Sequence, residues 1–180
     1  MIGAYLSLSL PVLILAATLQ SSFATQLRVF GGSPDLVLMI VVSWAIESEL
    51  DEALTWAFVG GIVQDLLSAA PLGTSSLGLI LIVGVVHLIR RQVFTIGWPG
   101  VMLVAGVGTL IKETVFALVM AFTGMGSNYL YLFSYVILPT AVYNFALVFV
   151  VFGVVRFVQR GLWRNDRRYA LRQQTFVRRG

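Results

Sequence analysis

The sequence contains no cysteine and very little charge. Without cysteine there are no disulfide bonds, no thiolate nucleophile and no cysteine-ligated metal. Charged residues make up only 11% of the 180 residues, whereas a soluble domain has about 25%. Hydrophobic residues make up 58%. The composition therefore predicts an all-α, polytopic membrane protein with no room for a soluble catalytic domain.

The chain also has a single histidine and none of the common catalytic motifs. There is no HExxH helix, phosphate-binding loop, nucleotide-binding fingerprint or serine–histidine–aspartate arrangement. His87 shortly precedes Arg90 and Arg91, so we place it at the membrane interface, and a metal there would need ligands that the neighbouring sequence lacks. We expect a protein that is not an enzyme and has no metal or other cofactor.

Apolar segments separated by glycine, proline and charge predict about six transmembrane helices. They cover about 2–24, 35–47, 52–69, 75–92, 98–123 and 131–157. The second segment is short, because only eleven uncharged residues separate Asp35 from Glu47, and a span needs about 20. This segment either extends back through Val29 and Phe30 or is re-entrant.

Basic residues predict the orientation. Arginine-rich segments favour the cytoplasmic side, and eight of the twelve basic residues lie in the last twenty-five positions. We therefore expect both termini in the cytoplasm, a single transmembrane domain over 1–160 and a basic cytoplasmic tail over 161–180. The basic side chains expected to lie against anionic lipid are those of Arg90, Arg91, Arg160, Arg164, Arg167 and Arg168. Nucleic-acid binding is not expected.

Asp65 is a charged residue inside an otherwise apolar segment. An ionisable group in hydrocarbon costs several kcal/mol unless it faces protein or a water-filled cavity. In steps of four from Asp65 the residues are small, including Gly61, and Gln64 lies beside it. Small residues at this spacing let helix backbones approach closely in lipid. This face is therefore predicted to pack against another helix.

The fifth predicted span contains Lys112 and Glu113. Lys112 and Asp65 lie fourteen and thirteen residues from the starts of their spans, so we expect them at similar depth. We hypothesise that spans three and five pack through these faces. Lys112 then either pairs with Asp65 or is shared between Asp65 and Glu113. Such a pair is either internal to the bundle or part of a site for a partner or substrate.

Prolines and glycines indicate local structure at three further places. Pro34 and Asp35 predict the start of the second helix, which a carboxylate caps well. The segment from Pro71 to Gly73 predicts a tight turn. Asn144, which follows a proline in the last span, is expected to form an interhelical hydrogen bond.

Three segments give the chain a resemblance to the rod shape-determining protein MreD family of bacteria. These are Leu19-Gln20-Ser21-Ser22, Pro34-Asp35-Leu36, and Gly60-Gly61-Ile62-Val63-Gln64-Asp65-Leu66-Leu67-Ser68 followed by Pro71-Leu72-Gly73. The length, the predicted helix count and the short basic C-terminus also fit, so the resemblance covers nearly the whole chain.

The resemblance implies a non-enzymatic component of the cell-elongation complex in the bacterial cytoplasmic membrane. It implies binding to the transmembrane helix of MreC and, through MreC, links to the RodA glycosyltransferase, its penicillin-binding transpeptidase partner and MreB. It also implies a fold like the substrate-binding subunits of energy-coupling-factor vitamin transporters. The alternative is a small-molecule transporter subunit with a ligand cavity lined by Gln64, Asp65, Lys112 and Glu113.

Overall fold

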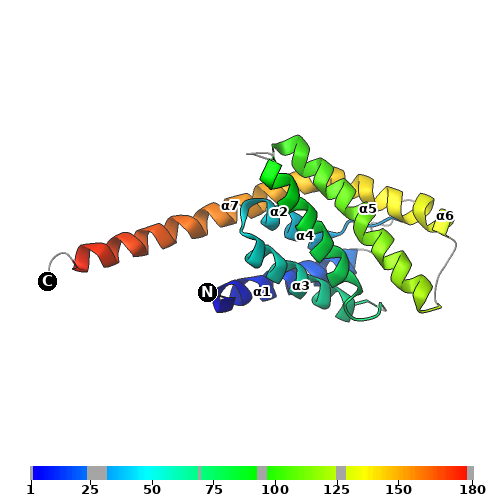
Figure 1. Cartoon of the computed structure of the whole chain (residues 1–180), viewed down its shortest axis with the longest axis horizontal. Helices are drawn as coiled ribbons and strands as arrows, with labels where there is room; N and C mark the ends of the chain where they lie inside the picture. Colours follow the sequence, from blue (N-terminus) through cyan, green and yellow to red (C-terminus); the bar gives the residue numbers. More distant parts are fainter. Residues whose placement is uncertain (1, 24–31, 69, 93–96, 125–128, 178–180) are drawn as a thin grey trace.

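The described part of the computed structural model is built from helices (Figure 1). It covers the backbone of residues 2–23, 32–68, 70–92, 97–124 and 129–177, and the side chains of 9–22, 32–68, 70–92, 97–124 and 130–160. In chain order the elements are α1 (Ile2–Phe23), α2 (Leu36–Glu47), α3 (Leu50–Leu66), α4 (Thr74–Gln92), α5 (Trp98–Phe122), α6 (Tyr129–Leu132), the π-helix η1 (Phe133–Ile137) and α7 (Leu138–Val177).

Within the described residues, three helical segments are long and apolar enough to cross a membrane. They are Thr74–Gln92, Trp98–Phe122 and Leu130–Arg160. Two shorter apolar helices cover Ser9–Ser22 and Leu36–Glu47. The predicted helical membrane class agrees with these elements, while the count of six spans and their orientation stay predictions.

The short helix α2 lies in the interior of the bundle. It contacts α1, α3, α4, α5 and α7, and Val37, Leu38, Val41 and Val42 are completely buried. Its twelve residues make a helix of about 18 Å. This segment is apolar because protein surrounds it, so it does not need the length that a lipid-facing span needs. Val29 and Phe30, through which an extension was considered, lie outside the described residues.

The small-residue face of α3 packs against α4. A Cβ added at Gly61 would overlap the backbone N and Cα of Ser76, so the two helix backbones touch. The hydroxyl of Ser76 donates a hydrogen bond to the carbonyl oxygen of Phe58 across this contact (3.1 Å). The glycine therefore serves close helix packing in the way that small residues do within membranes.

The predicted packing of spans three and five through their small residues is wrong, because Gly61 and Gly108 both contact α4, and α3 reaches α5 only through the longer side chains of Gln64 and Lys112 among the described contacts. On its other side α4 contacts α5, where Gly78 lies against the Lys112 side chain and Ile82 lies against Gly108. Gly61 of α3 and Gly108 of α5 thus both serve helix packing, but each contacts α4. A spacing pattern identifies a contact face and does not identify the helix that fills it.

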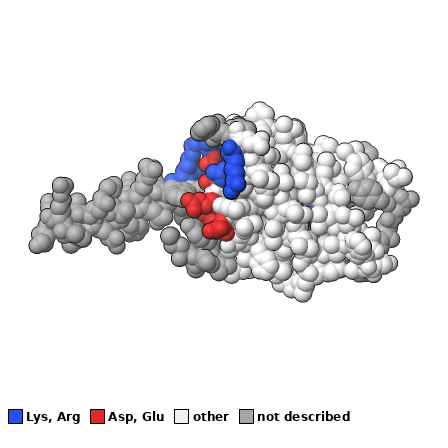
Figure 2. All heavy atoms as spheres, viewed as in Figure 1, with Lys and Arg blue, Asp and Glu red and all other residues white. Residues whose placement is uncertain are grey.

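Charged side chains gather at one end of the bundle, where α7 continues away from the other helices (Figures 1 and 2). Here Arg156 pairs with Glu47 (Nε to Oε1, 3.2 Å), and the Trp44 indole N–H donates a hydrogen bond to Glu52 Oε1 (2.8 Å). Arg90 makes the contacts described below. We call this the charged end and the opposite end the far end. The predicted domain boundary after residue 160 falls within α7, which continues as one helix to Val177.

Candidate functional site

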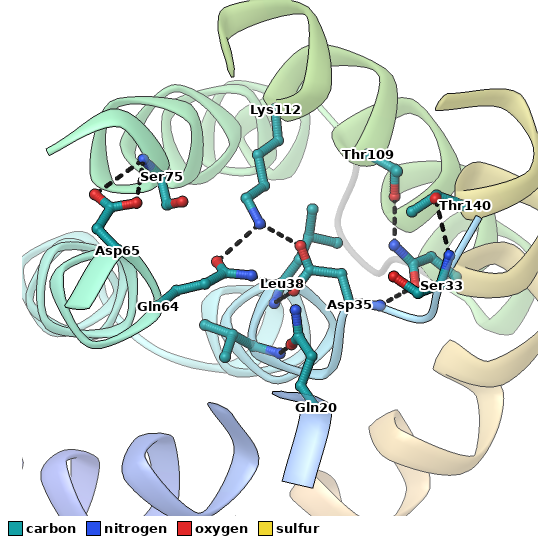
Figure 3. A network of polar contacts seen from close by, with 12 residues as sticks. Gln20, Ser33, Asp35, Leu38, Gln64, Asp65, Ser75, Thr109, Lys112 and Thr140 are labelled. Atoms are coloured by element: carbon teal, nitrogen blue, oxygen red, sulfur yellow. Dashed lines mark hydrogen bonds and ion pairs between the residues drawn. The ribbon is translucent and has the colours of Figure 1, made fainter. Parts of the chain in front are cut away.

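A buried triangle of polar side chains joins α2, α3 and α5 (Figure 3). The Lys112 ammonium forms an ion pair with Asp35 Oδ2 and donates a hydrogen bond to Gln64 Oε1 (2.8 Å). The amide of Gln64 donates in turn to Asp35 Oδ1 (3.2 Å). Asp35 is 4% exposed and Lys112 is 5% exposed. Each charge is therefore removed from lipid and satisfied by protein, as a charge within a bundle must be.

Asp35 has a second role as the N-cap of α2. Its Oδ1 accepts a hydrogen bond from the backbone N–H of Leu38 (3.0 Å), which satisfies one of the free N–H groups at the helix start. Pro34 directly before it is buried. The sequence predicted a helix start here, but the pairing of Asp35 with Lys112 was missed. A carboxylate ahead of a helix has an ordinary explanation as a cap, so nothing indicated a second partner.

The predicted pairing of Lys112 with Asp65 is wrong. The Asp65 carboxylate instead accepts hydrogen bonds from the backbone N–H groups of Gly73 (2.7 Å) and Ser75 (3.1 and 3.2 Å). The prediction that this part of α3 and Lys112 lie at similar depth agrees with the structure, because Gln64, which precedes Asp65, contacts Lys112. Consecutive helix residues point about 100° apart, however. Gln64 therefore faces α5, and Asp65 faces the start of α4.

Asp65 stabilises the turn between α3 and α4. The turn closes with a hydrogen bond from Thr74 N–H to the Pro71 carbonyl (3.2 Å), and Gly73 adopts the left-handed φ of +93° that favours glycine. Asp65 then places negative charge against free N–H groups at the start of α4, which is favourable for both. It is 2% exposed.

Replacing Asp65 with alanine is expected to destabilise the α3–α4 turn. The part-buried N–H of Gly73 and the buried N–H of Ser75 lose their acceptor, and an unsatisfied buried N–H costs about 1–3 kcal/mol. Amide hydrogen exchange in detergent should show faster exchange at residues 73–77 than in the parent protein. Asp65→Asn retains an acceptor oxygen and should lie between the two. Equal protection in all three proteins would contradict this role.

Glu113 takes no part in the triangle. It is half-buried on α5 beside Lys112, and the described contacts of the ammonium are with Asp35 and Gln64. The alternative in which Glu113 shares Lys112 with Asp65 is therefore wrong as well.

Side chains of α7 and α5 hold the non-helical segment that leads into α2. The Ser33 N–H donates to Thr140 Oγ1 (3.3 Å), and the Asp35 N–H donates to Asn144 Oδ1 (2.8 Å). Asn144 Nδ2 donates to Thr109 Oγ1 (2.8 Å), which confirms its predicted interhelical hydrogen bond. Irregular backbone at membrane depth persists only where protein satisfies it. These three side chains do so here.

Two of these positions, Thr109 and Thr140, were not singled out from the sequence, and neither was the contact made by Gln20. The Gln20 side-chain oxygen accepts from the Val37 N–H at the start of α2 (3.2 Å). Threonine is common in membrane helices, so only the neighbouring proline and asparagine indicated polar packing around Thr140.

The other end of α2 is held at the charged end of the bundle. Arg90 Nη1 donates to the carbonyl oxygens of Ala45 (3.1 Å) and Ser48, where the helix leaves carbonyl groups free and cations are favoured. Arg90 thus has an internal role besides its expected place at the membrane surface. Arg91 and Arg160 are exposed, and the side chains of Arg164, Arg167 and Arg168 lie outside the described residues.

An apolar groove runs along the outside of the bundle between α1 and α3. Its volume is about 620 Å³, and it is lined by Leu10, Ile14, Thr18, Phe58, Val59, Ile62, Val63, Leu66 and Leu67. A smaller groove of about 120 Å³ lies between α4 and α5 and is also apolar. The four residues of the transporter hypothesis, Gln64, Asp65, Lys112 and Glu113, line neither groove.

Together these features define an all-helical membrane protein whose buried polar side chains bind one another and the ends of a central helix. The chain matches the family model of rod shape-determining protein MreD over residues 2–160. It belongs to the MreD family, which implies a role in rod shape determination. No match was found among curated proteins or among solved structures.

Proposed function

We propose that the protein is a non-enzymatic, multi-pass component of the rod complex in the bacterial cytoplasmic membrane. In this role it binds the transmembrane helix of MreC. Through MreC it is linked to the RodA glycosyltransferase, to the penicillin-binding transpeptidase that works with RodA, and to MreB, and it thereby supports peptidoglycan synthesis. Family membership supports this role, and the groove between α1 and α3 is the observation that carries the binding step.

The groove has the form that a partner helix needs. Leu10, Ile14 and Thr18 follow one another at steps of four along α1, and Phe58 and Ile62 do the same along α3. Rows at this spacing form the ridges and grooves into which a second helix packs. The nine-residue row on α1 is about 12 Å long at 1.5 Å per residue, which is enough for two turns of a partner.

The internal polar network supports a structural role over a chemical one. Asp35, Lys112 and Gln64 form ion pairs and hydrogen bonds with one another, and the Asp65 carboxylate accepts hydrogen bonds from the backbone of the turn. Buried polar groups that are fully satisfied give a single rigid arrangement. Such a bundle presents a constant outer surface to a partner.

The membrane topology forms part of the same proposal. Six spans with both termini in the cytoplasm, in an arrangement like the substrate-binding subunits of energy-coupling-factor transporters, place the charged end at the cytoplasmic surface. The arginines that follow residue 156 then lie beside anionic lipid.

Cysteine cross-linking in membranes tests the binding of MreC. Because the natural sequence has no cysteine, each introduced cysteine is the only one in this chain that can react. Ile62→Cys on the α1–α3 groove is expected to form a disulfide with single cysteines placed along the MreC transmembrane helix, at every third or fourth position. Leu103→Cys, which lines the smaller α4–α5 groove, is the matched control and should react much less. Efficient co-purification of MreC with cross-linking only from Leu103 would move the interface away from the α1–α3 groove. Recovery of the chain alone with a tightly bound metabolite would favour the transporter instead.

A further inference from the structure

Glu113 is an ionisable residue inside a membrane helix, and its carboxylate has no bonding partner among the described residues. Asp35 is bound by Lys112 and Gln64, and Asp65 is bound by the backbone of the α3–α4 turn. Within the described part of the chain, no hydrogen bond or ion pair reaches the Glu113 carboxylate. Glu113 therefore lacks the compensation that the carboxylates of Asp35 and Asp65 have.

Glu113 lies too deep in α5 to reach water at either end of the helix. This helix, from Trp98 to Phe122, is long and apolar enough to cross a membrane. Glu113 is fifteen residues from its start and nine from its end, or about 22 and 14 Å along the axis. Long basic side chains near helix ends extend to the membrane surface, but the shorter side chain of a glutamate at this depth does not.

The face of α5 that carries Glu113 packs against α7. Four residues before Glu113, Thr109 accepts a hydrogen bond from Asn144 of α7 (2.8 Å). Seven residues before it, a Cβ added at Gly106 would contact Phe145 of α7 (3.6 Å). Residues at these spacings share one side of a helix. Glu113, which is half-buried, therefore belongs to the contact between α5 and α7.

The charges that act on Glu113 already bind each other. Lys112 and Asp35 have the largest electrostatic effect on Glu113, and these two residues form an ion pair. The sequence from Tyr129 to Val155, which supplies α6, η1 and the adjoining part of α7, contains tyrosines but no acidic residue, basic residue or histidine. The histidine and arginines of α4 lie within its last six residues, at the charged end. No unpaired cation of the described elements therefore faces Glu113.

An isolated ionised carboxylate in such a place is very costly, and a buried group of this kind takes its neutral form instead. An ionisable residue within the membrane also indicates a site with a ligand or partner. Because α7 occupies this face of α5, the ligand that fits is the smallest one that removes the charge. We propose that Glu113 is a proton-binding site within the membrane and is a neutral carboxylic acid in the folded protein at neutral pH. The proton comes from water and adds to one carboxylate oxygen, and no bond of the protein breaks.

The bound proton protects the buried triangle. An ionised Glu113 would place a second carboxylate beside Lys112, where it would compete with Asp35 for the ammonium. Asp35 also caps α2, so this competition would loosen the start of the central helix. Proton occupancy of Glu113 is thereby coupled to the support of α2. This inference is independent of the proposed binding of MreC, since it rests on α5 and the helices packed against it.

Infrared spectroscopy of the whole chain in lipid vesicles at neutral pH tests the proposal. A protonated carboxyl group has a carbonyl stretching band that is separate from the amide bands and from those of ionised carboxylates. The difference spectrum between the parent protein and Glu113→Gln should contain this band. Asp65→Asn is the matched control, because Asp65 is a buried carboxylate held by N–H groups. That variant should lose ionised carboxylate absorption and keep the protonated band.

Stability provides a second readout. Glutamine has the size of a neutral glutamic acid, so Glu113→Gln should unfold in detergent at the same temperature as the parent. It should also keep the parent's hydrogen-exchange protection at residues 36–40. A clear rise in unfolding temperature would show that Glu113 is ionised and unpaired, and a clear fall together with faster exchange at 36–40 would show that its charge supports the triangle. Either result overturns the proposal, as does loss of ionised carboxylate absorption in the Glu113→Gln difference spectrum.

Isotope labelling keeps the test decisive if Glu113→Gln does not purify. Glutamate labelled with carbon-13 would be incorporated into the Glu52→Gln chain, in which the amide oxygen can still accept the hydrogen bond from Trp44. The other two glutamates, Glu47 and Glu49, are exposed and ionised at neutral pH. The protonated band should shift with the label. A spectrum without a band that shifts would mean that Glu113 is ionised and would overturn the proposal.

Discussion

Replacing Gly61 with alanine is expected to prevent α3 and α4 from packing together. The added Cβ overlaps the backbone N and Cα of Ser76, and backbone atoms of a paired helix cannot move aside separately. Inserting atoms into a packed interior costs about 1–3 kcal/mol and occasionally more, and we expect this site to be at the upper end. Thermal unfolding in detergent, followed by tryptophan fluorescence, should show a large fall in Tm or a failure to purify as a single species.

A matched control for this change lies on the facing helix. A Cβ added at Gly84 on α4 meets no atom within 4 Å, so Gly84→Ala should be neutral or stabilising by about 1 kcal/mol through helix propensity. Ser76→Gly should not rescue Gly61→Ala, because the overlap involves backbone atoms. Equal stability of the two glycine variants would show that α3 and α4 are not in backbone contact.

Replacing Lys112 with methionine is expected to leave Asp35 as an uncompensated buried charge. Breaking a buried pair by removal of one partner costs about 3–5 kcal/mol. Asp35 also caps α2, so the start of the central helix should loosen with it. Unfolding in detergent measures the loss, and hydrogen exchange at residues 36–40 should locate it.

The double variant Asp35→Asn with Lys112→Met separates the pair from simple loss of packing. The asparagine oxygen can still cap α2, and no unpaired charge remains, so much of the lost stability should return. A double-mutant cycle between Asp65 and Lys112 should be additive to within about 0.5 kcal/mol, as for sites that share no contact. If the coupling energy between Asp65 and Lys112 exceeds that between Asp35 and Lys112, the result would support the pairing of Lys112 with Asp65 that the sequence predicted.

The two variants, Gly61→Ala and Lys112→Met, are expected to lose stability at different helix contacts of the same bundle. Gly61 allows α3 and α4 to approach, and Lys112 joins α5 to the start of α2. Arg90 holds the other end of α2. A central helix fixed at both ends gives the outer helices a common support, which the proposed binding of a partner helix requires.

Much of this protein could be predicted from its residues taken in order. The scarcity of charge predicted the membrane class, and the motifs around Gly61, Asp65 and Gly73 predicted the family. The turn at Pro71 and the helix start at Pro34 depend on backbone preferences of a few adjacent residues. Such features are local, so they can be predicted without knowledge of the tertiary structure.

The partners of the polar groups were decided only by the tertiary structure. Sequence spacing placed Asp65 and Lys112 at matching depth, but the direction in which each side chain points depends on how its helix is rotated and on what stands between. Because Asp65 points towards the start of α4 and not towards α5, it meets the backbone of the next turn, and Lys112 reaches Asp35 across seventy-seven positions of sequence. Residues thus determine which groups must be satisfied inside the membrane, and packing of the helices determines which group satisfies which.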